Sequence, residues 1–251
     1  MRLPLALAAT LLATTPALAV PVVGLGTNNQ LVTFDTDRPM ASRPVTITGV
    51  EGRLVGIDVR PADKRVYGLS DRNVLYRIDV ATGRAEMASR LDRALDLGAG
   101  AVVDFNPVAD RLRVIGASGQ NYRINVDTGM VAVDGAIKYE SGQGTPRVVA
   151  GAYYNSMAGA TSTELVNIDA GAKQVTVQAP PNDGVQKARA PLSASADRIA
   201  LDIYLDGSMN RAVAVMGRSL VGLDLMSGRI DAGREIQGLT IDLIDLTVVL
   251  R

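Results

Sequence analysis

Two stretches of the chain, VGIDVRPADKRVYGLSDRNVLYRIDVATG over residues 55–83 and AVVDFNPVADRLRVIGASGQNYRINVDTG over residues 101–129, align without a gap at an offset of 46 residues. Nine of the 29 aligned positions are identical, where chance would give about two. The identical residues of the first copy are Asp58, Pro61, Arg65, Tyr76, Arg77, Ile78, Val80, Thr82 and Gly83. The chain therefore contains a repeated unit of this length.

Each unit has the pattern of several short strands. In the first copy, alternating apolar residues bounded by turn residues predict strands over 54–59, 65–69, 73–79 and 84–88. All units, including weaker copies elsewhere in the chain, share one dipeptide step in which an apolar residue is followed by Asp or Asn. The Asp or Asn residues of this step are Asp35, Asp79, Asn125, Asp169 and Asp224. Four strands in about 46 residues is the period of a β-propeller blade. A β-sandwich with coincidental internal similarity is the alternative.

The two ends of the chain predict how the ring closes. Only three strands are expected before residue 50, near 22–25, 31–35 and 45–48, so the first blade lacks its innermost strand. The segment 239–250 supplies a surplus strand that carries the step Ile241-Asp242. We expect an all-β, five-bladed propeller of about four strands per blade, closed by the C-terminal strand joining the N-terminal blade. Residues 179–196 are expected to form a long loop.

Composition removes several classes of function. The chain has no His, Cys or Trp, which excludes disulfides, a thiolate nucleophile, a Ser-His-Asp triad and imidazole metal ligands. The balance of 26 basic and 26 acidic residues argues against a nucleic-acid partner. Asp outnumbers Glu by 21 to 5, and Asp favours turns over helix interiors.

The N-terminus has the pattern of a signal peptide. Met1-Arg2 is a positive start, residues 3–12 are apolar, and Ala17-Leu18-Ala19 is a small-x-small cleavage site. Cleavage after Ala19 would leave one propeller domain over 20–251. No other segment reaches the ~20 apolar residues of a membrane span. We therefore expect a monomer in the periplasm or outside the cell.

Acidic residues on the expected inner strands are the sharpest chemical signal. Equivalent strands of successive blades bring these residues around one axis, where crowded carboxylates could bind a hard cation such as calcium. The candidate metal ligands are Asp58, Asp104, Asp202 and Asp242. The alternative is that each Asp accepts hydrogen bonds from the neighbouring blade, from its backbone or from Arg65, Arg111 and Arg211. Blade four departs from the pattern, with Tyr153 where the other blades have Asp.

Other residue groups have a simpler interpretation. Asp79, Asn125, Asp169 and Asp224 precede Gly-containing turns and are expected to accept hydrogen bonds there. The tyrosines at 153, 154 and 204 either stack on a ligand or pack between blades.

Several strings together resemble a known family. They are QLVTFDT from Gln30, LVGIDVRP from Leu54, VDFNP from Val103 with DRLRV from Asp110, GQN from Gly119 ahead of NVDTG, and PPNDG from Pro180. In this order they look like the bacterial domain-of-unknown-function family numbered 4394, over residues 22–243. The resemblance implies an exported, propeller-like domain with no assigned activity and no catalytic residues to carry over.

Two functions remain open from the sequence. The first is an exported, non-catalytic module that binds a protein or small-molecule partner in the cell envelope without a cofactor. The second is a carboxylate- and metal-dependent hydrolase, similar to calcium-dependent propeller lactonases, in which the inner-strand Asp residues hold the cation. Propellers host both classes, so the fold does not decide between them.

Overall fold

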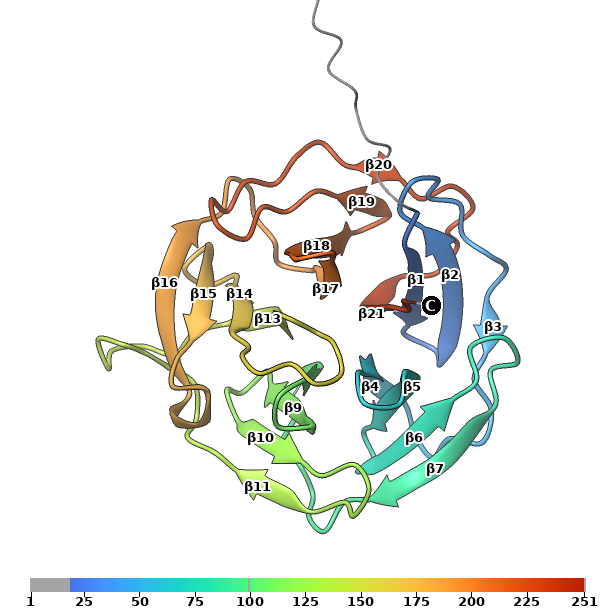
Figure 1. The fold of residues 1–251 in the computed structure, drawn as a ribbon, viewed down its shortest axis with the longest axis horizontal. Helices are drawn as coiled ribbons and strands as arrows, with labels where there is room; N and C mark the ends of the chain where they lie inside the picture. The colour runs from blue at the N-terminus through green and yellow to red at the C-terminus, as the bar shows by residue number, and fades with distance from the viewer. Residues whose placement is uncertain (1–18, 99, 251) are drawn as a thin grey trace, which may run out of the picture.

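A computed structural model describes residues 19–98 and 100–250. These residues form five sheets arranged around one axis, each radiating outward like a blade (Figure 1). Four sheets have four strands and one has five, and the only helix in the described residues is the short 3-10 turn η1, Pro181–Asp183. The predicted all-β, five-bladed propeller is therefore confirmed.

The blades, from inner to outer strand, have the following bounds. Blade 1 contains β21 (Leu243–Val248), β1 (Pro21–Gly26), β2 (Gln30–Asp35) and β3 (Val45–Thr46). Blade 2 contains β4 (Leu54–Arg60), β5 (Arg65–Ser70), β6 (Val74–Ile78) and β7 (Ala85–Arg90). Blade 3 contains β8 (Ala101–Asn106), β9 (Arg111–Gly116), β10 (Asn121–Ile124) and β11 (Val131–Val133). Blade 4 contains β13 (Val148–Tyr153), β14 (Leu165–Asp169), β15 (Gln174–Gln178), β16 (Val185–Pro191) and β12 (Lys138–Tyr139). Blade 5 contains β17 (Ala200–Asp206), β18 (Met209–Met216), β19 (Ser219–Val221) and β20 (Arg234–Glu235).

The turns between strands follow from local chemistry. After β6, the Asp79 carboxylate accepts hydrogen bonds from the backbone N–H groups of Ala81 and Thr82, both at 2.9 Å. Gly83 then has a φ of 72°, a conformation that residues with a Cβ disfavour. A Cβ at Gly83 would also lie 2.3 Å from the carbonyl oxygen of Thr46 in the neighbouring blade. The predicted turn role of Asp79 is therefore what the structure shows.

The C-terminal strand closes the ring as predicted. Strand β21 pairs antiparallel with β1, with Val248 opposite Val22, and becomes the innermost strand of the first blade. The strand begins at Leu243, however, so the step Ile241-Asp242 lies before it. The predicted long loop over 179–196 is wrong in part, because it contains η1 and the seven-residue strand β16.

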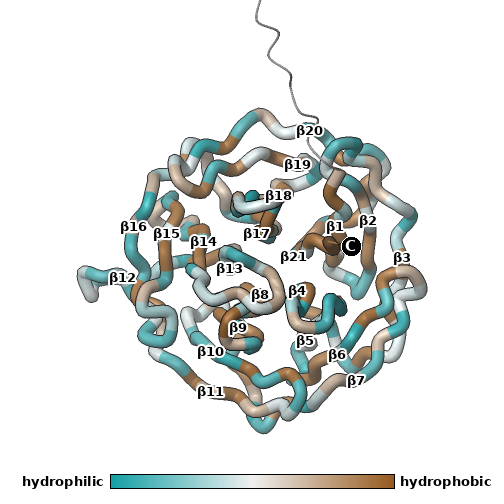
Figure 2. The backbone as a smooth tube through the Cα atoms, in the orientation of Figure 1, coloured by the Kyte–Doolittle hydropathy of each residue, from teal (hydrophilic) through white to brown (hydrophobic). Residues whose placement is uncertain are grey.

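The hydrophobic core lies between the blades. Figure 2 shows hydrophobic residues concentrated along the strands and hydrophilic residues in the outer turns. Five apolar clusters fill the five blade interfaces. Between blades 2 and 3, for example, the rings of Tyr67 and Phe105 meet edge to face with centroids 5.5 Å apart.

The interface between blades 3 and 4 uses polar groups as well. Its apolar cluster has only six buried residues, and the fully buried Arg113 donates to Tyr153 Oη, Asn182 Oδ1 and Asp134 Oδ2 at 2.7–3.1 Å. Asn121 Nδ2 donates to the carbonyl oxygen of Pro181 at 3.0 Å. The polar strings at 119–121 and 180–184 thus meet each other across this interface.

The predicted signal peptide falls almost wholly on residues 1–18, which lie outside the described residues. Ala19 is described and exposed, and Val20 is the first buried residue of the described part. Within the described residues, no helix is long and apolar enough to cross a membrane.

Ring closure by β21 predicts unequal effects of two substitutions on that strand. Leu246 is 2% exposed and Ile244 is 40% exposed. Leu246→Ala should lower the free energy of unfolding by about 2–5 kcal/mol, the usual cost of a buried cavity. Ile244→Ala should cost less than about 1 kcal/mol, because little apolar area leaves the core. Urea denaturation measures both, and equal effects would contradict the closure.

Candidate functional site

Three aspartates meet at the axis of the propeller. Asp58, Asp104 and Asp202 lie on the inner strands β4, β8 and β17 and are 4%, 5% and 6% exposed. One carboxylate oxygen from each lies within 4.8 Å of the others. The structure therefore brings together three of the four residues predicted from the sequence.

Each of these carboxylates also bonds to the next blade. Asp58 Oδ2 accepts from the N–H of Phe105 at 2.7 Å, and Asp104 Oδ1 accepts from the N–H of Tyr153 at 2.9 Å. Asp202 Oδ2 accepts from the N–H of Val248 at 2.7 Å. The donor in each case belongs to an inner strand of the neighbouring blade, so these bonds fix the blades in register.

The same bonding pattern identifies the equivalent positions on the inner strands of the other two blades, and the five positions together form a ring of side chains around the axis. In blade 1 the position is Thr247, whose Oγ1 accepts from the N–H of Val59 in blade 2 at 3.1 Å. In blade 4 it is Ala152, and the prediction that Tyr153 occupies this position is wrong, because the N–H of Tyr153 donates to Asp104 as the N–H of Phe105 donates to Asp58. Ala152 offers no side-chain acceptor to blade 5, and the N–H of Ile203 donates instead to Asp202 Oδ1 of its own strand. From blade 2 to blade 5 and then blade 1, the ring residues are therefore Asp58, Asp104, Ala152, Asp202 and Thr247.

The hydroxyl of Thr247 lies between two carboxylates and can donate a hydrogen bond to only one of them. Its hydroxyl oxygen lies 2.9 Å from Asp58 Oδ1 and 3.3 Å from Asp202 Oδ2, and both are acceptors when ionised. A hydroxyl has one hydrogen to donate. The three groups can satisfy one another fully only if a carboxyl is protonated or a cation replaces the missing hydrogen.

Among the described residues, no basic side chain compensates the charge of the three carboxylates. In the described part of the chain, none of the ring carboxylates forms an ion pair with Lys or Arg. The expected arginine partners are engaged elsewhere: Arg211 pairs with Asp206 at 2.6 Å, and Arg111 donates to the backbone carbonyls of Ala109 and Asp110. The prediction that arginines link these carboxylates to the neighbouring blade is therefore wrong, and backbone N–H groups donate to them instead.

Burial and mutual repulsion change the acidity of the ring. Burial, and next the charge of Asp202, raises the pKa of Asp58 well above its ordinary value. Burial, followed by the charges of Asp58 and Asp202, does the same to the pKa of Asp104. Burial raises the pKa of Asp202 to about 6. Proton uptake at this ring is therefore favoured in the folded state.

The fourth predicted ligand, Asp242, does not join the ring. It is exposed and precedes β21. A second apolar-Asp step, Ile244-Asp245, lies inside the strand, and Asp245 Oδ2 accepts from the N–H of Ile57 at 2.8 Å. Asp245 is two residues before Thr247, and burial raises its pKa well above the ordinary value. The missed ring member, Thr247, carried no acidic signal in the sequence.

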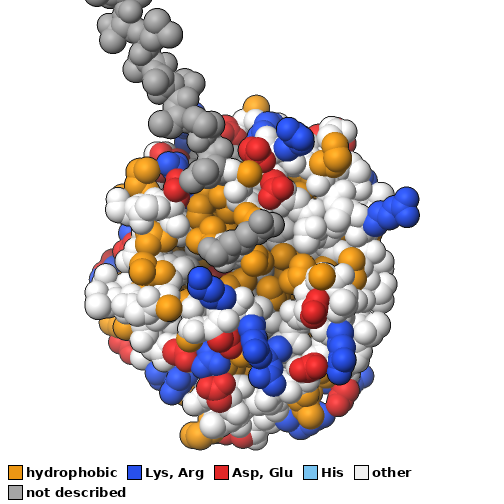
Figure 3. Space-filling view, turned by 45° about the vertical axis from the view of Figure 1, so that its right-hand side comes forward, with side chains coloured by type: hydrophobic (Ala, Val, Ile, Leu, Met, Phe, Trp, Pro, Cys, Tyr) orange, Lys and Arg blue, Asp and Glu red, His pale blue; other side chains and the backbone are white. Residues whose placement is uncertain are grey.

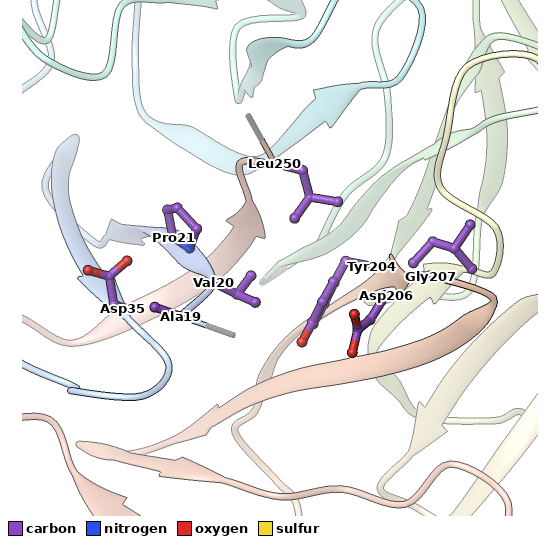
Figure 4. A pocket seen from close by; sticks show the side chains of 9 residues that line it. Ala19, Val20, Pro21, Asp35, Tyr204, Asp206, Gly207 and Leu250 are labelled. Carbon is purple, nitrogen blue, oxygen red and sulfur yellow. The ribbon is translucent and has the colours of Figure 1, made fainter. Parts of the chain in front are cut away.

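Hydrophobic side chains gather on the surface near blade 1, as Figure 3 shows. A hollow of about 440 Å³ opens here between blades 1 and 5, and Tyr204, Val20 and Leu250 line it (Figure 4). Of the tyrosines considered from the sequence, Tyr153 is buried between blades and Tyr204 is only partly covered.

Comparison with known proteins agrees with the fold. A family model described as "Domain of unknown function (DUF4394)" matches residues 30–247. No curated protein matches the chain. Among 409 matching solved chains is the crystal structure of a structural genomics protein of unknown function from Bacteroides thetaiotaomicron VPI-5482. It is 17% identical with a TM-score of 0.53, and the match covers 93% of this chain and 65% of that one. This likeness shows the fold alone.

The raised pKa values predict how stability depends on pH. A carboxyl with a folded-state pKa above its unfolded value of about 3.9 contributes stability at low pH that is lost as the pH rises through the folded-state pKa. Without divalent cations, the free energy of unfolding should therefore fall as the pH rises from about 4 to above 6, because the pKa of Asp202 is about 6. Asp202→Asn should make this fall shallower, whereas Asp242→Asn, at an exposed position, should not. Equal slopes in urea titrations of all three proteins would contradict the assignment.

Proposed function

The chain belongs to the DUF4394 family of domains of unknown function, and we propose that it is an exported, non-catalytic binding module whose three axial carboxylates take up one hard divalent cation, calcium. The observation that carries the proposal is the convergence of three buried carboxylates with no basic partner among the described residues. The cation locks the blades together, and a protein or small-molecule partner in the cell envelope binds the module, which works as a monomer.

The spacing of the axial oxygens suits calcium. Two oxygens bound to one calcium ion at about 2.3–2.6 Å lie at most about 5 Å apart, and the three carboxylate oxygens are within 4.8 Å of one another. Thr247 Oγ1 supplies a fourth oxygen beside Asp58 and Asp202. A cation also removes the need for the hydrogen that Thr247 cannot supply to both carboxylates.

A catalytic use of the same carboxylates fits the geometry less well. A hydrolase needs its acid or metal-bound water within hydrogen-bond reach of the substrate. Here the three side chains are 4–6% exposed, and each also bonds to the backbone of a neighbouring blade. We therefore propose a structural and binding role for the cation.

Calcium titration of the purified protein tests the cation site. Calcium at 100 times its dissociation constant should stabilise the fold by about 2.7 kcal/mol, and EDTA should reverse the shift in melting temperature. Asp104→Asn should abolish the calcium response, because it removes a carboxylate of the ring. Asp242→Asn is the matched control, since it removes an acid outside the ring, and should keep the response.

Two outcomes would contradict the proposal. The first is a melting temperature that does not respond to calcium, magnesium or EDTA in the wild-type protein. The second is hydrolysis of esters or lactones by the wild-type protein that disappears in Asp104→Asn, which would favour the enzyme.

A further inference from the structure

Two hollows lie on either side of Pro21, the first residue of β1. The first is the hollow of about 440 Å³ between blades 1 and 5 described above. The second, of about 560 Å³, lies on the side of blade 2, where Val80 forms part of its wall. Pro21 and Asp35 line both hollows. The two hollows therefore adjoin, and together we call them the double hollow.

The walls of the double hollow are mostly apolar. They include Val20, Leu205 and Leu250 in the first hollow and Phe34, Met40 and Val249 in the second. Met40 is 61% exposed and Leu250 is 39% exposed, and Figure 3 shows hydrophobic side chains gathered on this part of the surface. Apolar side chains that line a concave surface and stay exposed to water are typical of a binding site for another molecule.

Asp35, which lines both hollows, differs from its equivalents in the other units. Those equivalents each accept at least one hydrogen bond from a backbone N–H of the turn that follows; they are Asp79, Asn125, Asp169 and Asp224. The Asp35 carboxylate forms no hydrogen bond or ion pair with any described residue. The N–H of Thr36 donates instead to the carbonyl oxygen of Val20 at 3.1 Å. The carboxylate of Asp35, at the edge of the first hollow in Figure 4, is therefore available to a ligand.

The charges that line the double hollow are unbalanced. Among the described lining residues there are two acids, Asp35 and Asp206, and no Lys or Arg. Asp206 is already paired with Arg211 at 2.6 Å. Arg234 contacts the turn after Asp35, but it donates there to two backbone carbonyl oxygens. A ligand that complements this surface therefore has apolar groups and a positive charge beside Asp35.

We propose that the double hollow binds an extended segment of a partner protein, in which apolar side chains flank one Lys or Arg. The basic side chain pairs with Asp35, and the apolar side chains on either side of it enter the two hollows. An extended backbone points every second side chain to the same face, so the pattern apolar-x-basic-x-apolar matches this surface. This inference rests on the binding role proposed above, and it names the surface and the kind of partner.

A compact small molecule fits the double hollow less well. Small-molecule sites enclose most of the surface of their ligand. Here the apolar walls reach the molecular surface at Met40 and Leu250, and the two hollows lie next to each other rather than inside the fold. A chain that lies along the surface can fill both.

Binding of a short peptide tests the inference. The probe is acetyl-Leu-Ser-Arg-Ser-Leu-amide, and two control peptides carry Glu in place of Arg or Ala in place of both Leu residues. Titrations are followed by NMR of protein labelled with ¹³C at the methionine methyl groups. The signal of Met40 should shift with the probe, whereas the signals of Met87 and Met130, which do not line the double hollow, should not. Both control peptides should bind more weakly.

Substitutions at two acids of the same turn test the role of Asp35. Asp35→Asn should weaken binding of the Arg peptide about twofold to fivefold, the usual range for an exposed charge pair. Asp35→Lys should reverse the preference, so that the Glu peptide binds better than the Arg peptide. Asp37→Asn is the matched control, because Asp37 is exposed and lines neither hollow, and it should leave the affinity unchanged.

Three outcomes would overturn the inference. They are a Met40 signal that does not respond to the probe, equal binding of the Arg and Glu peptides, and a Met40 signal that changes with protein concentration alone, which would indicate a second copy on this surface. Calcium titration of the wild-type protein is measured separately. Peptide binding without a calcium response would refute the cation site and keep the double hollow, whereas a calcium response without peptide binding would refute only the double hollow.

Discussion

The propeller depends on hydrogen bonds that run from a side chain of one blade to the backbone of the next. Backbone ladders hold each blade together as a separate sheet. Isolated bridges, Met40 with Gln237 and Thr48 with Arg84, join blade 1 to its neighbours near the outer strands, and they do not position the inner strands. Apolar packing between blades resists separation and is not directional. The bonds from Phe105, Tyr153 and Val248 to their Asp acceptors are directional, and they set the height of each inner strand along the axis. Burial of three carboxylates follows from this requirement, and the candidate cation site follows from the burial.

The sequence predicted the architecture because the signals of the repeat are local in the chain. The offset of 46 residues, the Asp79-type turns and the surplus C-terminal strand each depend on only a few neighbouring residues. Asp58 and Asp104 were found because they occupy identical places in the best-conserved pair of units. Asp242 was chosen wrongly because two apolar-Asp steps lie three residues apart at the C-terminus, and only pairing with β1 determines which one is in the strand.

Other features depend on contacts that no local pattern contains. Thr247 replaces an acid in the ring, and its role appears only when blades 1, 2 and 5 are assembled. The buried Arg113 joins strings that are about 60 residues apart in the sequence, since Asn121 and Pro181 meet across two blades. A turn-rich string such as PPNDG predicts a loop, but it does not predict that Asn182 in this loop accepts a hydrogen bond from the buried side chain of Arg113.

Pairing of the first and last strands also constrains the order of assembly. Val22 and Val248 are neighbours in the sheet and are separated by 248 − 22 = 226 residues in the chain. Closing a flexible loop of that length costs about 5 kcal/mol of chain entropy. The cost falls once blades 2 to 5 have stacked, because the stack itself carries the two ends toward each other. Blade 1 therefore completes last, and a nascent chain cannot acquire its native ring until its final strand has been made.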